Sequence, residues 1–432
     1  MSIADENHVD SESQPNPFRR LAFRQWYAAT TLLAVSTSTM VAVTLALVDV
    51  TASVALAGLI SGLILGIELL VVPIGGGLAD VISRRTLLRR ALFAALAANT
   101  VLVALLTTLT LAGGEGRAWI AWAVVVALVV SAGAAGIADP ALDASARSLI
   151  KPPEFPRAMS AEQARSSTLQ IVGSPASGGL YALIPSAPFM LRVLCDLGFL
   201  LTLRHIRQDL GPVTHEGLDK DSGASPRGRY AQALLGYREA LSFLRQHRAL
   251  RRVLVAAPLV NLMVFSGTSW TVLHLASTGV NALTTGITVA GFAVGGLIGS
   301  AIAPALTDRF PPGPLAIVGL SWMTAIFAGL FLCDGRPWTL FVLGVLAMLP
   351  SPALNGGLFA HVFAETSPGM QGRVMATFSL VGGLATVAAP IVAGAAIQAR
   401  LDATLGVFTC AIGALGVLVL LTSPAVRAMP RP

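Results

Sequence analysis

The chain alternates long apolar runs with short polar turns along almost its whole length. A helix that crosses the hydrocarbon core of a bilayer needs roughly 20 apolar residues, and twelve runs of about that length fit in the 432 residues. We predict spans centred on residues 26–48, 54–78, 88–111, 119–138, 163–184, 188–203, 253–275, 283–306, 315–333, 338–358, 374–396 and 405–421. The sixth is short, and Pro350 and Pro352 interrupt the tenth. This pattern predicts an all-α integral membrane protein with twelve transmembrane helices.

Composition supports a membrane protein and excludes several function classes. Only 12% of the residues are charged and the mean hydropathy is +0.74, whereas a soluble protein carries about 25% charged residues. The chain has no Gly-rich loop ending in Lys and Ser or Thr, so it does not encode ATP hydrolysis. No nucleophile–base pair and no cluster with metal-ligand spacing stands out, so we expect neither an enzyme, nor a metal site, nor a cofactor. Cys195, Cys333 and Cys410 lie in apolar spans and are predicted to be inert packing residues.

The basic residues indicate the orientation. With an even number of spans both termini lie on one side, and a cytoplasmic N-terminus leaves only Arg117, Arg192, Arg336 and Arg400 outside. The other 25 of 29 Lys and Arg then fall inside, as the positive-inside rule demands. The net charge of +7 therefore reports orientation rather than nucleic-acid binding. Because arginine outnumbers lysine 27 to 2, which favours a GC-rich bacterial genome, we expect the location to be a bacterial cell membrane.

The longest polar stretch divides the predicted spans into six and six. It runs over residues 204–250, between a first half at 26–203 and a second half at 251–422. Residues 1–25 are polar, lack the apolar core of a signal peptide, and are interpreted as a disordered cytoplasmic tail. Residues 423–432 form a second cytoplasmic tail. We therefore predict two six-helix halves joined by a cytoplasmic linker.

Part of the linker has an apolar stripe at alternating steps of four and three residues, made by Tyr230, Leu234, Tyr237, Leu241 and Leu244. Such a helix either lies on the inner leaflet or packs under the membrane helices. Short matches also recur in the same order in the two halves, as in Leu78-Ala-Asp80 and Leu306-Thr-Asp308. An internal repeat of this kind predicts two pseudo-symmetric halves that face each other across a central cavity.

The turn after the second span reads Gly76-Gly-Leu78-Ala-Asp80-Val-Ile-Ser-Arg84-Arg85. Gly76 would let another helix approach closely. Asp80 can accept hydrogen bonds from a helix N-terminus or pair with a cation. Arg84 and Arg85 would hold the turn among anionic head groups. We interpret this turn as a gate motif.

This turn resembles the signature loop of the major facilitator superfamily, although Val81 and Ser83 replace the usual Arg and Gly. The fifth span carries Gly173-Ser-Pro175-Ala-Ser-Gly178-Gly179, which is similar to the antiporter motif Gly-Pro-x-x-Gly-Gly. With the linker segment from Tyr237, these motifs resemble the drug:proton antiporter-like exporters that include macrolide and siderophore exporters. The resemblance covers about residues 22–422. It implies contacts between halves through spans 2 and 11 and spans 5 and 8, and a cavity lined by spans 1, 4, 7 and 10.

The sequence departs from that resemblance at one position that matters for coupling. Many proton-coupled drug exporters carry a buried Arg in the fourth span, and residues 119–138 contain none. Small residues recur at every fourth position in two other spans and predict close helix packing. They are Gly58, Gly62 and Gly66 in the second span, and Gly291, Gly295 and Gly299 in the eighth.

Ionisable groups inside a membrane are costly and are functional candidates by default. Glu68 lies 12 residues before Asp80, hence roughly 18 Å along the helix at ~1.5 Å per residue, near the middle of the bilayer. We predict that Glu68 carries the coupling proton. The alternatives are a pair with a cationic substrate and a permanently neutral structural carboxyl group. Arg192 and Asp196 are spaced to mask each other's charges, and the resemblance implies that their helix faces away from the cavity.

Two acidic residues near the end of the fourth span, Asp139 and Asp143, could form a cytoplasmic latch with Arg147 or simply a solvated helix end. The candidate contacts for substrate are Ser36, Ser38, Asn261, Thr268, Trp270 and Asn355. Polar groups amid Met and Phe suit a moderately apolar organic molecule held by a few hydrogen bonds. The hydroxyl groups could instead bond their own helix backbone.

The sequence therefore predicts a monomeric secondary transporter that exports small organic molecules, such as a drug, an antibiotic or a siderophore-like compound, by proton-coupled alternating access. Its expected partners are the substrate, protons and membrane lipid, with no nucleic acid. One alternative is a uniporter, symporter or lipid-type flippase of the same fold. Another is a membrane scaffold or sensor that transports nothing.

Overall fold

The computed structural model describes residues 16–79, 82–111, 117–150, 154–206, 210–211, 238–333, 335–367 and 370–429. Within these ranges every regular element is a helix. The first half contains η1 (Pro17–Arg19), α1 (Leu21–Thr37), α2 (Met40–Thr51), α3 (Val54–Ala79), α4 (Arg84–Leu111), α5 (Arg117–Leu149), α6 (Phe155–Leu183) and α7 (Ala187–His205). The second half contains α9 (Arg248–Ser277), α10 (Ala282–Arg309), α11 (Pro312–Leu332), α12 (Pro337–Met348), α13 (Ser351–Glu365), α14 (Gln371–Gln398), α15 (Asp402–Leu421) and α16 (Pro424–Arg427).

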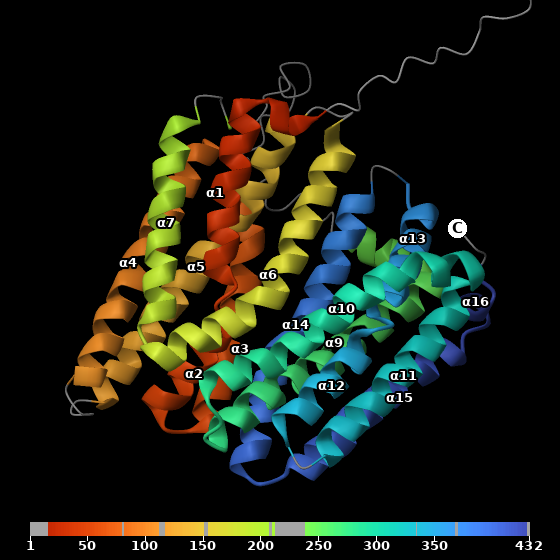
Figure 1. Cartoon of the computed structure of the whole chain (residues 1–432). Helices are drawn as coiled ribbons and strands as arrows, with labels where there is room; N and C mark the ends of the chain where they lie inside the picture. Colours follow the sequence, from red (N-terminus) through yellow and green to blue (C-terminus); the bar gives the residue numbers. More distant parts are fainter. Residues whose placement is uncertain are drawn as a thin grey trace, which may run out of the picture.

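These helices occupy the twelve predicted spans. Within the described residues, ten helical segments are long and apolar enough to cross a membrane; α1 with α2 makes one of them and α12 with α13 another. The fifth and sixth predicted spans are α6, with 29 residues, and α7, with 19. Both are long enough for a span but fall outside those ten because they are more polar. The predicted fold class, an all-α membrane protein with two six-span halves, is confirmed (Figure 1).

Two of the spans are broken in the middle. The tenth breaks between α12 and α13 at Leu349 and Pro350, as the prolines predict. The first breaks between α1 and α2 at Ser38 and Thr39, where the sequence has neither Gly nor Pro. Here side-chain hydroxyl groups donate to backbone carbonyl oxygens of the preceding turn. Ser38 Oγ donates to Val35 O at 2.8 Å, and Thr39 Oγ1 donates to Ser36 O at 3.0 Å. Hydroxyl side chains that bond their own helix bend it, so the three consecutive hydroxyl groups of Thr37, Ser38 and Thr39 account for this break.

The break separates two segments with different neighbours. The α1 helix packs mainly on α7, in the first half. The α2 helix contacts α3, α5 and α6 of the first half and also α9 of the second. The first span is therefore shared between the halves.

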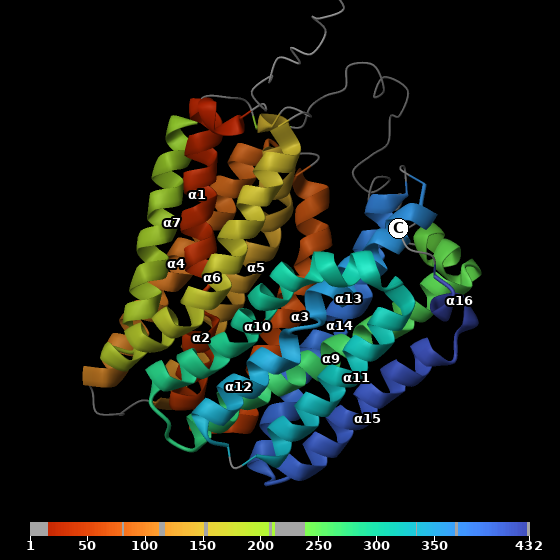
Figure 2. The ribbon, with the colours of Figure 1, turned by 45° about the vertical axis from the view of Figure 1, so that its right-hand side comes forward.

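The two halves touch on one side of the molecule. We call the side where α1 begins and residues 238–246 lie the linker side, and the opposite side, where α6 turns into α7 and α9 into α10, the far side. Across the halves α3 packs on α14, and α6 packs on α10, as the resemblance implies. A Cβ added at Gly62 would lie 2.6 Å from Val387 O, and one added at Gly178 would overlap the carbonyl group of Ala282. These contacts lie in the far-side part of each helix, and the bundles lean away from each other toward the linker side (Figure 2).

The glycine row of the eighth span makes the predicted close packing, and its partner lies within the same half. A Cβ at Gly291 would lie 2.5 Å from Phe341 O, and Gly295 and Gly299 similarly face the backbone of Val345 and Leu349. All three partners belong to α12 or the turn after it, so this row packs α10 inside its own half. The cross-half contact of α10 comes instead from Gly286, nearer the far side.

The described part of the linker helix packs under the second half. Residues 238–246 are helical, and Ala240 and Leu244 are 0% exposed in the core shared with α9 and α14. Glu239 accepts an ion-pair contact from Arg373 of α14 at 2.7 Å. For these residues the packed alternative is correct. The other stripe residues, Tyr230, Leu234 and Tyr237, lie outside the described ranges.

Candidate functional site

A cavity of about 520 Å³ lies between the two halves. Its wall is mostly apolar, with Leu33, Ile64, Leu128, Phe265 and Val272 among the lining residues. The first, fourth and seventh spans line it as expected, but the tenth does not; α3, α4, α6, α7, α10 and α14 contribute instead. The first half supplies most of the wall, because the second half leans away from it on the linker side.

Glu68 lies in the wall of this cavity. The side chain is half-buried and makes no hydrogen bond or ion pair with any described residue. The α3 helix is held closely against α5 here, since a Cβ at Gly136 would lie 2.9 Å from Glu68 O. Glu68 is near enough to Arg192 and to Asp139 for the charges to interact. The carboxyl group is therefore positioned rigidly and accessible from the cavity.

Arg192 and Asp196 lie at the centre of a buried polar cluster on α7. Arg192 is 9% exposed and Asp196 1%, yet both line the cavity. Arg192 Nε donates to Ser36 O at 3.1 Å and to Thr39 Oγ1 at 2.6 Å, at the break in the first span. Asp196 accepts from Ser36 Oγ at 3.1 Å and from Asn99 Nδ2 at 2.7 Å. Satisfied hydrogen bonds of this kind are what buried charges require.

This cluster corrects the prediction for α7. Arg192 and Asp196 do not form an ion pair within 4.0 Å in the part of the chain described, and they face the cavity rather than away from it. Each finds partners on α1 or α4 instead. The spacing of four residues would allow Arg192 and Asp196 to pair with each other, but in the fold both side chains hydrogen-bond to residues outside α7.

Asp139 also lines the cavity and makes no hydrogen bond to a described residue. It lies close enough to Glu68 and to Asp143 for their charges to interact. The side chain of Arg147 lies outside the described part of the chain, so the latch stays a prediction.

Five of the six candidate substrate contacts fall into three groups. Ser36 and Thr268 line the central cavity. Asn261 and Asn355 line a second cavity of about 280 Å³ inside the second half. Ser38 packs against Gly173, whose added Cβ would lie 2.6 Å from the Ser38 Cβ, and is not among the lining residues.

Trp270 corrects another expectation. It is 2% exposed and packs among α11 and α15 rather than facing the cavity. Its indole Nε1 donates to Asp402 Oδ1 at 2.5 Å, and its ring stacks on His274 at 4.5 Å. The seventh span presents Thr268 and Phe265 to the cavity and turns Trp270 the other way, because a helix turns 100° per residue.

The predicted gate turn is described only in part. Asp80 lies outside the described residues. Gly76 has only Pro140 near it, at 3.9 Å from an added Cβ, whereas Gly75 makes the close approach, 2.7 Å from Gly136 O. Leu78 is partly buried in the linker-side core of the first half. The close contact is thus one residue earlier than predicted and lies within the first half.

The basic pair of this turn binds protein rather than standing free for lipid. Arg84 Nη1 donates to Ala144 O at 3.1 Å on α5, and Arg85 donates to the backbone carbonyl of Ile206 after α7. The Arg85 bond caps the end of α7, where carbonyl groups lack partners, and the Arg84 bond reaches the penultimate turn of α5. The two arginines therefore tie the linker-side ends of α4, α5 and α7 together.

The antiporter-like motif builds the crossing of α6 with α10. Gly178 packs against Ala282, and a Cβ at Gly179 would lie 3.3 Å from Leu283. Pro175 lies inside α6, and Gly286 of α10 faces it, with an added Cβ 3.1 Å from the proline Cα. Gly173 meets Ser38 at the break in the first span. The motif residues thus contact both the second half and the broken span.

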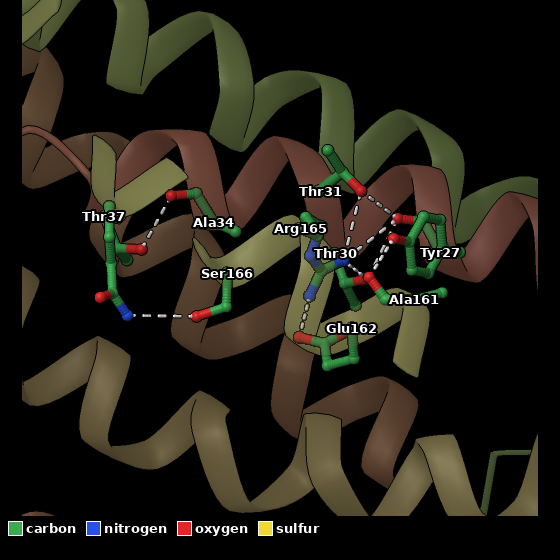
Figure 3. Close-up of polar contacts among 10 residues, drawn as sticks. Tyr27, Thr30, Thr31, Ala34, Thr37, Ala161, Glu162, Arg165 and Ser166 are labelled. Carbon is green, nitrogen blue, oxygen red and sulfur yellow. Dashed lines mark hydrogen bonds and ion pairs between the residues drawn. The ribbon is translucent and has the colours of Figure 1, made fainter. Parts of the chain in front are cut away.

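A second polar cluster joins α1 to α6 on the linker side (Figure 3). Arg165 Nη1 donates to Thr30 Oγ1 at 2.7 Å and to Thr31 Oγ1 at 3.2 Å, and Nη2 pairs with Glu162. The guanidinium lies 5.0 Å from the centre of the Tyr27 ring. The sequence analysis missed this cluster; its only local signal is the Glu162–Arg165 spacing of three residues.

Comparisons with known proteins agree with this architecture. No protein-family model matches the sequence, and no curated protein sequence matches it. Solved structures do match. A bacterial homologue of the iron transporter ferroportin in its inward-facing state is similar over 93% of this chain and 99% of that chain, with a TM-score of 0.71 and 15% identity. The same homologue in its outward-facing state, soaked with iron, has a TM-score of 0.57 at 15% identity, over 93% and 98% of the chains.

A D-xylose–proton symporter matches over 95% of this chain and 98% of its own, with a TM-score of 0.64 and 16% identity. At such identities the likeness establishes the fold and leaves activity open. The chain therefore has the two-half, all-α membrane fold of these solved structures.

Proposed function

We propose that this chain is a secondary transporter that moves small organic molecules by alternating access. The observation that carries this proposal is the central cavity of about 520 Å³, which lies between two halves whose main contacts, α3 with α14 and α6 with α10, involve the far-side parts of these helices. A cavity of roughly 300–1,000 Å³ suits a drug-sized ligand. Rocking of one half on the other would expose the same cavity first to one side and then to the other.

The linker side is the cytoplasmic side in this proposal. The excess of Lys and Arg on linker-side segments supports that assignment. The conformation is then inward-facing, and the higher TM-score to the inward-facing than to the outward-facing ferroportin homologue supports this reading. The organism's plasma membrane is the corresponding location.

Glu68 is the proposed proton carrier, and export is the proposed direction. A cavity-lining carboxyl group without a hydrogen-bond partner can exchange a proton with whichever side the cavity faces. If protonation and substrate binding exclude each other, proton entry drives substrate export. The resemblance to drug:proton antiporter-like exporters supports that sign of coupling.

The experiment uses purified protein in proteoliposomes with an imposed pH gradient and a panel of radiolabelled organic cations, zwitterions and neutral compounds. Glu68→Gln should abolish gradient-driven accumulation and keep substrate exchange, because the amide resembles the neutral acid. Glu365→Gln, which changes an exposed carboxylate at the end of α13, is the matched control and should behave as the wild type.

Other outcomes would change the assignment. If Glu68→Gln accumulates substrate as well as the wild type, Glu68 is not the carrier, and Asp139 becomes the next candidate. If Glu68→Gln keeps both gradient-driven accumulation and substrate exchange, whereas Glu68→Leu loses both, Glu68 is a structural carboxyl group that stays neutral. No movement of any compound in the panel would refute the transporter proposal itself.

A further inference from the structure

The guanidinium of Arg192 has unused hydrogen-bonding capacity that faces the central cavity. The single N–H of its Nε is shared between two acceptors at the break in the first span, Ser36 O and Thr39 Oγ1. Its two Nη atoms donate to no described residue, and neither is among the buried atoms that are sealed off without a partner. Since the side chain is 91% buried and lines the cavity, the Nη groups are reachable only from there.

The carboxylate on the same helix does not occupy the Nη groups of this arginine. Asp196 lies within electrostatic range of Arg192, but it accepts its hydrogen bonds from Ser36 Oγ and Asn99 Nδ2 and makes no ion pair with Arg192 within 4.0 Å among the described residues. A planar guanidinium with free Nη groups matches a carboxylate in a bidentate geometry. The cavity therefore offers a prepared anion site at the joint between α1 and α2.

Two carboxyl groups in the same cavity are equally without partners. Glu68 and Asp139 both line it and neither bonds to a described residue. Glu68 lies within electrostatic range of both Arg192 and Asp139. The remaining wall is largely apolar, and Met40 and Phe265 are 54% and 42% exposed.

We propose that the cavity binds zwitterionic organic molecules, with the substrate carboxylate on the Nη groups of Arg192 and its ammonium group on Glu68 or Asp139. A purely cationic ligand would leave the Nη groups of Arg192 without an acceptor. A purely anionic ligand would leave two carboxylates facing it. A zwitterion with an apolar body satisfies both charges and the apolar wall at once.

This inference rests on the proposed function, because it names the substrate class of the same cavity. It also agrees with the proposed sign of coupling. A proton and a substrate ammonium group would compete for the same carboxylate, so proton binding would expel the substrate.

The test measures binding of the dipeptide Leu-Phe to the purified full chain in detergent by calorimetry. The comparison ligands are its C-terminal amide, which lacks the carboxylate, and its N-acetyl derivative, which lacks the ammonium group. We expect each blocked derivative to bind at least about tenfold more weakly, since a hydrogen bond to a charged group contributes about 1.5–3 kcal/mol. Arg192→Lys should weaken Leu-Phe by a similar factor and leave the amide unchanged, because a lysine lacks the planar fork. Arg204→Lys changes an exposed arginine on the same helix and should have no effect.

Several results would overturn the inference. It fails if the amide or the N-acetyl derivative binds as tightly as Leu-Phe, or if Leu-Phe and phenylalanine both fail to bind. It fails too if Arg192→Lys, with an unchanged unfolding midpoint, binds the dipeptide normally. If Arg192→Lys does not fold, the affinities of the wild type for Leu-Phe, its amide and its N-acetyl derivative still test the inference.

Binding and transport can fail separately. If Leu-Phe binds but neither it nor any compound of the panel moves in proteoliposomes, the transporter proposal is refuted and the zwitterion site is supported. A lipophilic cation that is pumped while no zwitterion binds supports transport and overturns the inference.

Discussion

The contact between Gly178 and Ala282 predicts how a single methyl group would shift the conformational equilibrium. A Cβ on Gly178 would overlap the carbonyl group of Ala282, so α6 and α10 would have to separate on the far side. Extra methyl groups forced into a packed contact cost about 1–3 kcal/mol. That cost falls only on the state in which these helices touch. Gly178→Ala should therefore favour the state open to the far side by about 5- to 150-fold.

The assay follows the labelling of a cavity cysteine from the far side. Thr268→Cys places the thiol in the central cavity, and a membrane-impermeant maleimide is added to vesicles of known orientation. The labelling rate above that of the parent chain reports how often the cavity opens to the far side. In Gly178→Ala the labelling rate should rise by about 5- to 150-fold, as long as the state open to the far side is the less populated one.

The matched control is Gly296→Ala on α10, because no atom lies within 4 Å of a Cβ added there. This variant also adds one methyl group to a glycine of a membrane helix, but that methyl group contacts no other helix. Equal far-side labelling in Gly178→Ala and Gly296→Ala, in a correctly inserted protein, would refute the conclusion that this crossing holds the far side closed.

Three further changes test other parts of the structure. Asn99→Ala removes one of two donors to buried Asp196 and should lower the free energy of unfolding by about 1–3 kcal/mol, seen as a lower thermal midpoint than in Thr100→Ala, whose exposed hydroxyl bonds only its own helix. Trp270→Phe should lower the midpoint by losing the Asp402 bond but leave ligand binding unchanged, and weakened binding would contradict its place outside the cavity. Asp80→Ala should slow transport severely with normal membrane insertion, and wild-type rates would argue against the gate assignment made from the sequence.

Hydropathy predicted the spans well because crossing a bilayer requires length and apolar character, which a sequence displays directly. It did not predict which way each helix turns. Trp270 and Thr268 are two residues apart, and only the tertiary packing of α9 puts Thr268 in the cavity and Trp270 against α15. The glycine row of α10 was predicted correctly as a close contact, yet its partner is α12 and not the other half.

The polar cluster around Arg192 could not be derived from spacing. A local pair with Asp196 was the simplest interpretation, but the actual partners, Ser36, Thr39 and Asn99, come from helices about 100 to 160 residues away. The break in the first span was hidden for a related reason. Glycine and proline mark breaks visibly, whereas Ser38 and Thr39 create one only because buried partners stabilise it.

The break in the first span makes α2 a third unit beside the two halves in the proposed alternating access. The α2 segment is tied to α6 twice, by Ala42 N donating to Ser177 Oγ at 2.9 Å and by Tyr181 Oη donating to Asp49 Oδ2 at 2.6 Å, while it also rests on α9. The α2 helix therefore lies between α6 and α9 on the far side, and the break at Ser38 and Thr39 connects it to α1. Opening that side requires α2 to leave one neighbour, so the order in which it releases α9 or α6 sets the route between the two conformations.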